Sequence, residues 1–256
     1  MIQFEIKEGV GKITLNRPDK YHSFVREMAL QLQDALDKCN DDKSIRAILI
    51  TATGKAFCAG QDLVEATDPN GPELSQIVQE HYNPIIRKIR NIEKPIVAAV
   101  NGVAAGAGAS IALCCDIVVA CESASFIQAF SKIGLIPDSG GTFFLPRLVG
   151  IQKATALMMT AEPVTATDAV DMGMIYKVLS DDSFEKESWE LVSRLAVMPT
   201  KGLGLTKRLL NTSFSNNLEQ QLDMEDKCQT IAGNTADCKE GIEAFFEKRK
   251  PNFKGE

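Results

Sequence analysis

The sequence predicts an α/β fold in which a β-rich first part is followed by a helical last part. Three apolar runs of strand length lie in "SIRAILITA", "KPIVAAVNG" and "CDIVVACES", and helical patterns separate them. The runs are nearly continuous instead of alternating, as expected of parallel strands that helices cover on both faces. From about residue 151 onward, helical patterns dominate and strand signals almost vanish.

The elements of the first part follow from periodicity and turn residues. Residues 2–15 form two short alternating runs around Glu8-Gly9, which is a hairpin signature. From Arg26 to about Asn40 the period becomes helical, and one face carries Met28, Leu32, Ala35 and Leu36. Residues 65–85 show no regular pattern, so their structure is left open.

Four helices are expected in the last part, at residues 165–174, 180–197, 216–233 and 236–250. The first two begin near Ser, Thr or Asp residues that can cap a helix. No Pro/Ser/Gly-rich linker separates the two parts, and there is no internal repeat. We therefore expect one core, residues 1–195, with a helical appendage, residues 196–256, of the kind that packs on another subunit.

Charge and cysteine usage exclude several classes of protein. A formal charge of -6 and a pI near 5.2 disfavour binding to nucleic acid or to an anionic membrane. The seven cysteines show no metal or redox spacing and are expected to be buried thiols in a reducing compartment. The N-terminus has no signal-peptide pattern and no apolar stretch reaches ~18 residues, so we expect a cytoplasmic protein with no metal site.

Two segments are almost devoid of side chains where a strand ends. Ala59 and Gly60 follow the run "KAFC", and "NGVAAGAGAS" follows the second long strand. Such turns let main-chain N–H groups meet a ligand, and two of them can stabilise an oxyanion. A tight turn and close packing of a helix on a sheet are the structural alternatives. The glycine spacing matches neither the dinucleotide-binding nor the P-loop motif.

Asp138 is the candidate acid–base residue. It lies between Pro137 and a Ser-Gly-Gly run, so a turn or helix N-cap role is the structural alternative. In the functional interpretation its surroundings are kept dry by Phe126, Ile127, Phe130 and Ile136, which would raise the pKa of its carboxyl group. By contrast, His22 and His81 are expected on the surface or in packing roles, and Asp116 is expected to be a structural acceptor.

Five motifs in this order span essentially the whole chain: "LNRPDKYHSF", "KAFCAGQDL", "KPIVAAVNGVAAGAGASIALCCDI", "GLIPDSGGTFFLPRLVG" and "CKEGIEAFFEKRKPNF". With them the sequence resembles the crotonase (enoyl-CoA hydratase/isomerase) superfamily. The resemblance implies a crotonase-like ββα spiral core with a C-terminal helical trimerisation segment. It also implies an acyl-CoA thioester as the substrate, no separate cofactor, and a homotrimer or a dimer of trimers.

The resemblance assigns roles to the three segments. The N–H groups of Gln61 and Ala107 would hold the thioester oxygen, and Asp138 matches the acid of the family's isomerases. Asp62 next to Gln61 could order that loop, and Phe245 and Lys248 would hold CoA from the C-terminal helices. The residues expected to bind substrate are Ser23, Phe24, Ala59, Gly60, Asp62, Leu63, Gly106, Phe130, Phe245 and Lys248.

One departure from the family pattern decides the expected reaction. Hydratases of the superfamily carry two glutamates, at positions that correspond to Ser110 and Phe130 here. We therefore expect an isomerase, acting on a ring epoxide of phenylacetyl-CoA to give the oxepin or shifting a 3-enoyl double bond to the 2-position. The alternatives are a hydratase that uses atypical groups, and a catalytically silent homologue that binds acyl-CoA or RNA.

Overall fold

Two sheets form the core of the protein. The computed structural model describes all 256 residues. The larger sheet has the strand order β1-β2-β3-β5-β7-β10, and the smaller has the order β4-β6-β8-β9. The strands are β1 (Ile2–Lys7), β2 (Val10–Leu15), β3 (Ala47–Ala52), β4 (Ala56–Cys58), β5 (Ile96–Val100), β6 (Val103–Ala105), β7 (Ile117–Cys121), β8 (Ser125–Ile127), β9 (Val164–Thr165) and β10 (Lys177–Leu179).

The strands predicted from the sequence are confirmed. β1 and β2 pair in an antiparallel hairpin, and its turn residues Glu8 and Gly9 both have positive φ values, 52° and 75°. β3, β5 and β7 are neighbouring parallel strands, and every residue of β5 is buried. Because both faces of these strands are covered, their sequences show continuous apolar runs.

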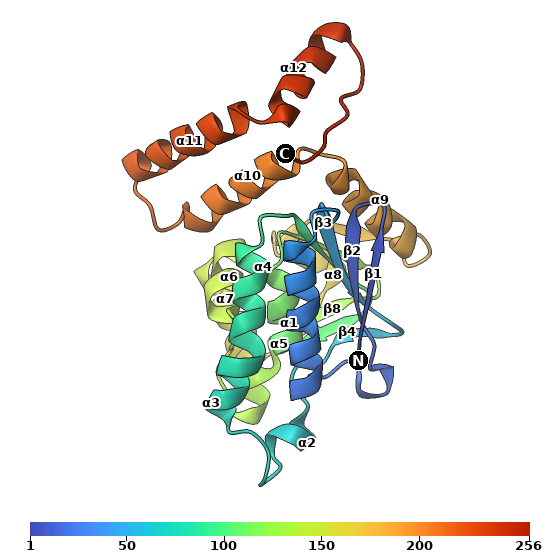
Figure 1. The fold of residues 1–256 in the computed structure, drawn as a ribbon. Helices are drawn as coiled ribbons and strands as arrows, with labels where there is room; N and C mark the ends of the chain where they lie inside the picture. The colour runs from blue at the N-terminus through green and yellow to red at the C-terminus, as the bar shows by residue number, and fades with distance from the viewer.

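Helices of the first part cover the larger sheet. α1 (Arg26–Asp41) buries the four predicted residues and packs beside α4 (Asn83–Asn91), as Figure 1 shows. The region left open contains α2 (Leu63–Ala66), α3 (Leu74–Gln76) and η2, a π-helix over Ile77–Tyr82. A π-helix bonds each residue five positions along, so the usual helical period is lost in this region. α5 (Ala107–Leu113) packs against β4, β5 and β6 and is buried throughout.

The second half contains two strands that the sequence analysis missed. β10 pairs in parallel with β7 at the edge of the larger sheet, and β9 pairs with β8. With three and two residues, they are too short to show a period. The helices here are η3 (Ala129–Ile133), α6 (Gly141–Val149), α7 (Ile151–Thr160), α8 (Ala166–Asp171) and α9 (Phe184–Ala196).

The C-terminal helices extend away from the core, as Figure 1 shows in orange and red. They are α10 (Thr200–Thr212), α11 (Leu218–Gly233) and α12 (Ala236–Glu247), and Asn217 and Thr235 cap the last two. The tail returns toward the core, where Arg46 donates to the Phe253 carbonyl at 2.7 Å. The two-part division and a role of these helices between subunits stay predictions.

The cysteines and the helices also bear on the class of protein. All seven cysteines are free, and every one except Cys238 is buried, as the composition predicts for small apolar side chains. None of the helices combines the length and the apolar composition needed to cross a membrane.

A buried ion cluster ties α10 to the core. Asp116 accepts from Lys207 at 2.8 Å, from Arg90 at 3.1 Å and from the Ile96 N–H at 2.9 Å. Lys207 is buried, and burial lowers the pKa of its ammonium group. The structural role predicted for Asp116 is therefore confirmed.

Asp116→Asn should lower the free energy of unfolding by about 3–5 kcal/mol, because it leaves two cations around a neutral group. Urea denaturation measures the change. Glu187→Gln is the matched control, since it breaks the exposed Lys177–Glu187 pair and should cost far less. Equal losses in the two variants would contradict this role of Asp116.

Candidate active site

Two turns with small residues meet where β4 and β6 end. The strands are parallel neighbours, so their carboxyl ends lie at the same edge of the smaller sheet. Gly60, after β4, has φ +90°, and a Cβ placed on it would lie 3.1 Å from the Ala105 oxygen and 3.4 Å from the Ala107 nitrogen. Only a glycine allows this approach. The structure therefore brings together the two segments that carry the predicted donors.

The N–H groups of Gln61 and Ala107 are available for a ligand. Gln61 lies outside every helix and strand, and its N–H donates to no other group of the protein. Ala107 is the first residue of α5, where N–H groups have no carbonyl partner within the helix. The neighbouring Gly106 N–H is occupied, since it donates to the Ile127 carbonyl at 2.9 Å. Two free donors at one place can stabilise a developing oxyanion.

Packing and function explain different glycines of "AAGAGAS". A Cβ on Gly108 would lie 2.4 Å from the Cys58 oxygen, so Gly108 lets α5 pack directly against β4. Gly106 has φ +54° and forms the turn before Ala107. The structural alternative of close helix packing is thus correct for Gly108, whereas Gly106 positions a donor.

Hydrogen bonds hold Gln61 from several sides. The Tyr82 hydroxyl donates to its Oε1 at 2.8 Å, and its Nε2 donates to Glu65 at 2.9 Å. The Phe24 N–H donates to the Gly60 carbonyl, and the Asp62 N–H donates to the Phe24 carbonyl. The Gln61 backbone is therefore fixed before any ligand arrives. Sequence reasoning missed Tyr82, which belongs to the π-helix.

Asp62 orders the loop that follows Gln61, in line with the sequence-based suggestion. It caps α2 by accepting the Val64 N–H at 2.9 Å and forms an ion pair with Arg17 at 2.7 Å. Burial opposes ionisation of Asp62, but the hydrogen bonds from Arg17 and Val64 outweigh it and lower its pKa. Ser23 is buried beside Arg17 and accepts from it through both its carbonyl and its hydroxyl group.

Asp138 lies on the turn between η3 and α6. Its carbonyl accepts the Gly141 N–H at 2.8 Å, and Ser139 and Gly140 have φ values of 51° and 74°. The N-cap residue of α6 is Gly140. Of the two structural alternatives for Asp138, the N-cap is therefore wrong and the turn is correct. Burial raises the pKa of the Asp138 carboxyl group, although the Ser139 hydroxyl donates to it at 2.9 Å.

The residues predicted to shield Asp138 behave differently from one another. The Phe130 ring is buried and lies 3.8 Å from the position of a Cβ on Gly106. It therefore borders the turn formed by Gly106 and Ala107, which we call the donor turn. Phe126 belongs to the hydrophobic core. Ile136 is 81% exposed, so its predicted shielding role is wrong. Proximity along the chain does not determine side-chain direction, and residues 131–136 lie at the surface.

The pKa of Asp138 is shifted in the opposite direction from that of Asp62, because no cation pairs with Asp138. No lysine, arginine or histidine forms an ion pair with Asp138. A partly buried carboxylate without a counter-ion is a stronger base than an ordinary aspartate. Asp138 is therefore suited to accept a proton from a bound ligand.

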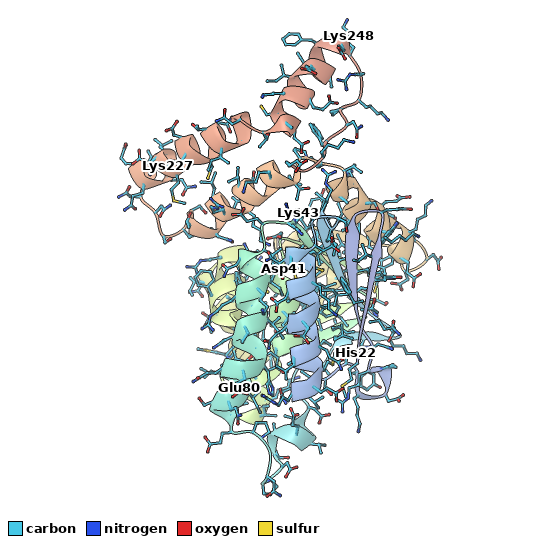
Figure 2. The ribbon with its side chains drawn as sticks, in the orientation of Figure 1. His22, Asp41, Lys43, Glu80, Lys227 and Lys248 are labelled. Atoms are coloured by element: carbon cyan, nitrogen blue, oxygen red, sulfur yellow. The ribbon has the colours of Figure 1, made fainter.

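Of the remaining residues predicted to bind substrate, two lie beside Gln61 and two lie far from the site. Ala59 and Leu63 are exposed on the loop that carries Gln61. Figure 2 shows Lys248 at the far end of the C-terminal region, remote from His22 and Glu80. Lys248 and its neighbour Phe245, which is 80% exposed, therefore do not reach the site of their own chain. Binding of CoA by these two residues stays a prediction about a second copy of the chain.

Both histidines are buried, so a surface position is wrong for each. His22 Nδ1 accepts the Arg17 N–H at 2.9 Å, and its Nε2 lies 2.7 Å from the Thr53 carbonyl. Burial is the largest influence on the pKa of His22 and lowers it. These bonds require a neutral ring with the proton on Nε2, which confirms a packing role for His22.

Comparisons with known proteins agree with this geometry. The family model described as Enoyl-CoA hydratase/isomerase matches residues 5–256. The 1,2-epoxyphenylacetyl-CoA isomerase of Escherichia coli is 46% identical over 98% of this chain and 97% of its own length. A Rhodobacter capsulatus protein named "Probable enoyl-CoA hydratase" is 41% identical, over 99% and 98%. The solved structure of an enoyl-CoA hydratase from Polaromonas has a TM-score of 0.92 at 34% identity, with 98% and 99% of the two chains covered.

Tyr82→Phe should loosen the loop that carries Gln61, because one hydrogen bond to its side chain is lost. We expect amide hydrogen exchange at Asp62, whose N–H donates to the Phe24 carbonyl, to become about fivefold faster. Tyr176→Phe, at an exposed tyrosine, is the control. Unchanged exchange in Tyr82→Phe would show that Gln61 is held without this bond.

Proposed function

Because the chain belongs to the enoyl-CoA hydratase/isomerase family and has the crotonase fold, we propose that it is an acyl-CoA isomerase with a single acid–base residue, Asp138. The observation that carries this proposal is the pairing of two free backbone donors with one carboxylate that has no counter-ion. No second carboxylate is needed for a proton shift within the acyl group.

The thioester oxygen binds between the Gln61 and Ala107 N–H groups. When a proton leaves the carbon next to the carbonyl, negative charge moves to this oxygen and an enolate forms. The two donors stabilise the enolate more strongly than the neutral carbonyl, and each is worth about 3 kcal/mol of the barrier. Gly60 and Gly106 leave room for the oxygen to reach the main chain.

Asp138 takes the proton and returns it to another carbon of the same acyl group. The C–H electron pair enters the enolate, the double bond moves, and the carboxylate is regenerated when the new C–H bond forms. A raised pKa favours both steps, since the carboxylate is a better proton acceptor and its acid is still able to donate. No water and no cofactor enter this scheme, since CoA is part of the substrate.

The substrate proposed is a ring epoxide of phenylacetyl-CoA or a 3-enoyl-CoA. In the epoxide, the C–C bond between the two epoxide carbons opens to give the seven-membered oxepin ring, while Asp138 moves a proton from the carbon next to the carbonyl to a ring carbon. The 3-enoyl-CoA becomes the 2-enoyl isomer by the proton shift alone. The similarity to the Escherichia coli isomerase supports the first, and phenylacetate catabolism is its metabolic setting. We also propose a homotrimer or a dimer of trimers in which α12 of a second copy brings Phe245 and Lys248 to the CoA.

A hydratase is the second candidate, since a relative that is 41% identical carries that name. Hydration needs one group to deprotonate water and another to handle the carbon proton. The positions that resemble the two glutamates of hydratases hold Ser110 and Phe130, and neither side chain is a carboxylate. The isomerase is therefore the better supported function.

Asp138→Asn should reduce isomerase kcat by about 10²- to 10⁴-fold, because the amide keeps the shape of the side chain but cannot accept the proton. Conversion of a 3-enoyl-CoA, followed as gain of absorbance by the conjugated thioester, measures the rate. In the wild type, kcat/KM should fall as the pH decreases through the raised pKa of Asp138, above the ordinary value of about 3.9. Wild-type turnover by the folded variant would refute the assignment.

Crotonyl-CoA hydration should be at least about a hundredfold slower than isomerisation, since general acid–base catalysis by a second carboxylate is missing. Loss of absorbance by the conjugated thioester measures hydration. The isomerase assay on the same preparation serves as the control. Hydration at a rate comparable to isomerisation would favour the hydratase instead.

A further inference from the structure

Two buried polar side chains near Asp138 have no hydrogen-bond partner in the protein. They are Ser110 on α5, which is 1% exposed, and Gln128 at the end of β8, which is 4% exposed. Neither Ser110 Oγ nor Gln128 Oε1 bonds to any other protein group. Buried polar atoms are nearly always hydrogen-bonded, so two orphaned oxygens at one place point to a ligand.

Gly141 shows that these two atoms meet at one place. A Cβ built on Gly141 would lie 2.9 Å from Ser110 Oγ and 3.7 Å from Gln128 Oε1. The same point lies 3.3 Å from Pro137 Cβ, on the residue before Asp138. A larger residue at position 141 would therefore press against the Ser110 hydroxyl, so glycine is what lets this turn lie directly beside the two buried oxygens.

The pair lies between the donor turn and the acid. The Ser110 N–H donates to the Gly106 carbonyl at 3.1 Å, and the Gly106 N–H donates to Ile127, the residue before Gln128. On the other side, the Gly141 N–H donates to the Asp138 carbonyl at 2.8 Å. Ser110 and Gln128 therefore adjoin both the turn that carries the Ala107 N–H and the turn that carries Asp138.

The chemistry of the pair selects the ligand. A serine hydroxyl donates one hydrogen bond. The Gln128 amide can also donate, because a rotation of the amide group by about 180° places its nitrogen where Oε1 now lies. Together they present two donors to one acceptor, whereas a hydrocarbon would leave both groups unpaired.

We propose that Ser110 and Gln128 form a binding site for an oxygen atom carried by the acyl group, close to the carbon that exchanges its proton with Asp138. The inference rests on the proposed function, since it assumes that the carbonyl lies at Ala107 and the reacting carbon at Asp138. It narrows the substrate to acyl-CoA thioesters with an epoxide, ether or hydroxyl oxygen near that carbon. The relative that acts on an epoxide, by its printed name, has a substrate of this class.

Binding of two inert CoA thioesters tests the proposal on the wild-type protein. 2-Hydroxyphenylacetyl-CoA carries an oxygen on the ring and phenylacetyl-CoA does not, and isothermal titration gives the Kd of each. We expect about tenfold tighter binding of the hydroxylated thioester, the ratio that one additional hydrogen bond produces. Equal Kd values would overturn the proposal without any variant.

Two variants locate the effect. Ser110→Ala and Gln128→Met remove the polar atoms with little change of volume. Each should lower the ratio of the two Kd values, and the double variant should bring it close to one. Binding of phenylacetyl-CoA should change by less than about twofold. Ser188→Ala, at a buried serine of α9 whose hydroxyl donates to the Glu185 carbonyl, is the control and should keep the wild-type ratio. Equal weakening of both thioesters would show a purely structural role and overturn the proposal.

The outcome is independent of the isomerase assignment, because neither thioester needs to react. If Asp138→Asn retains full turnover, the proposed function fails, yet the tenfold preference can still be measured. If Asp138 is essential and the preference is absent, only the oxygen site fails.

Discussion

Close contact between the turn after β4 and the start of α5 is the constraint on which the site depends. Side chains at Gly60, Gly106 or Gly108 would separate the two segments or strain the turn, since Gly60 and Gly106 have positive φ and Gly108 packs directly against Cys58. The contact places main-chain N–H groups, which carry a fixed direction and no flexible side chain, at one point. Donors organised before the reaction cost no rearrangement when charge develops.

Three of the aspartates, Asp116, Asp62 and Asp138, lie in different environments, and each environment favours a different role. Asp116 is surrounded by Lys207 and Arg90 and anchors α10. Asp62 faces Arg17 and caps α2, and its pKa is lowered. Asp138 has only the Ser139 hydroxyl, and burial raises its pKa. The two aspartates that pair with cations serve the structure, whereas burial without a cation makes the Asp138 carboxylate a stronger base than an ordinary aspartate.

The side chains near the donor turn and Asp138 also differ in polarity, and this difference affects which ligands they favour. Phe130 closes the donor turn with an apolar ring, while Ser110 and Gln128 leave polar atoms unpaired beside Gly141. An unpaired buried group penalises any ligand that cannot bond to it. In the proposed isomerase, the same few residues hold the enolate and discriminate among acyl groups, and none of them supplies the second carboxylate of a hydratase.

The sequence by itself determined the long strands, α1, the helices α8, α9, α11 and α12 and the two small-residue turns, because period, turn chemistry and motif spacing are local signals. It did not predict α7 or α10. Only the tertiary structure decided that β9 and β10 join the sheets, that Ile136 is exposed, that Tyr82 bonds to Gln61, and that the Ser110 and Gln128 oxygens are buried without a partner. Strands of two or three residues have no readable period, and the π-helix removes the usual one from residues 77–82. Side-chain direction and hydrogen-bond partners depend on contacts between segments far apart in the chain, which no local pattern records.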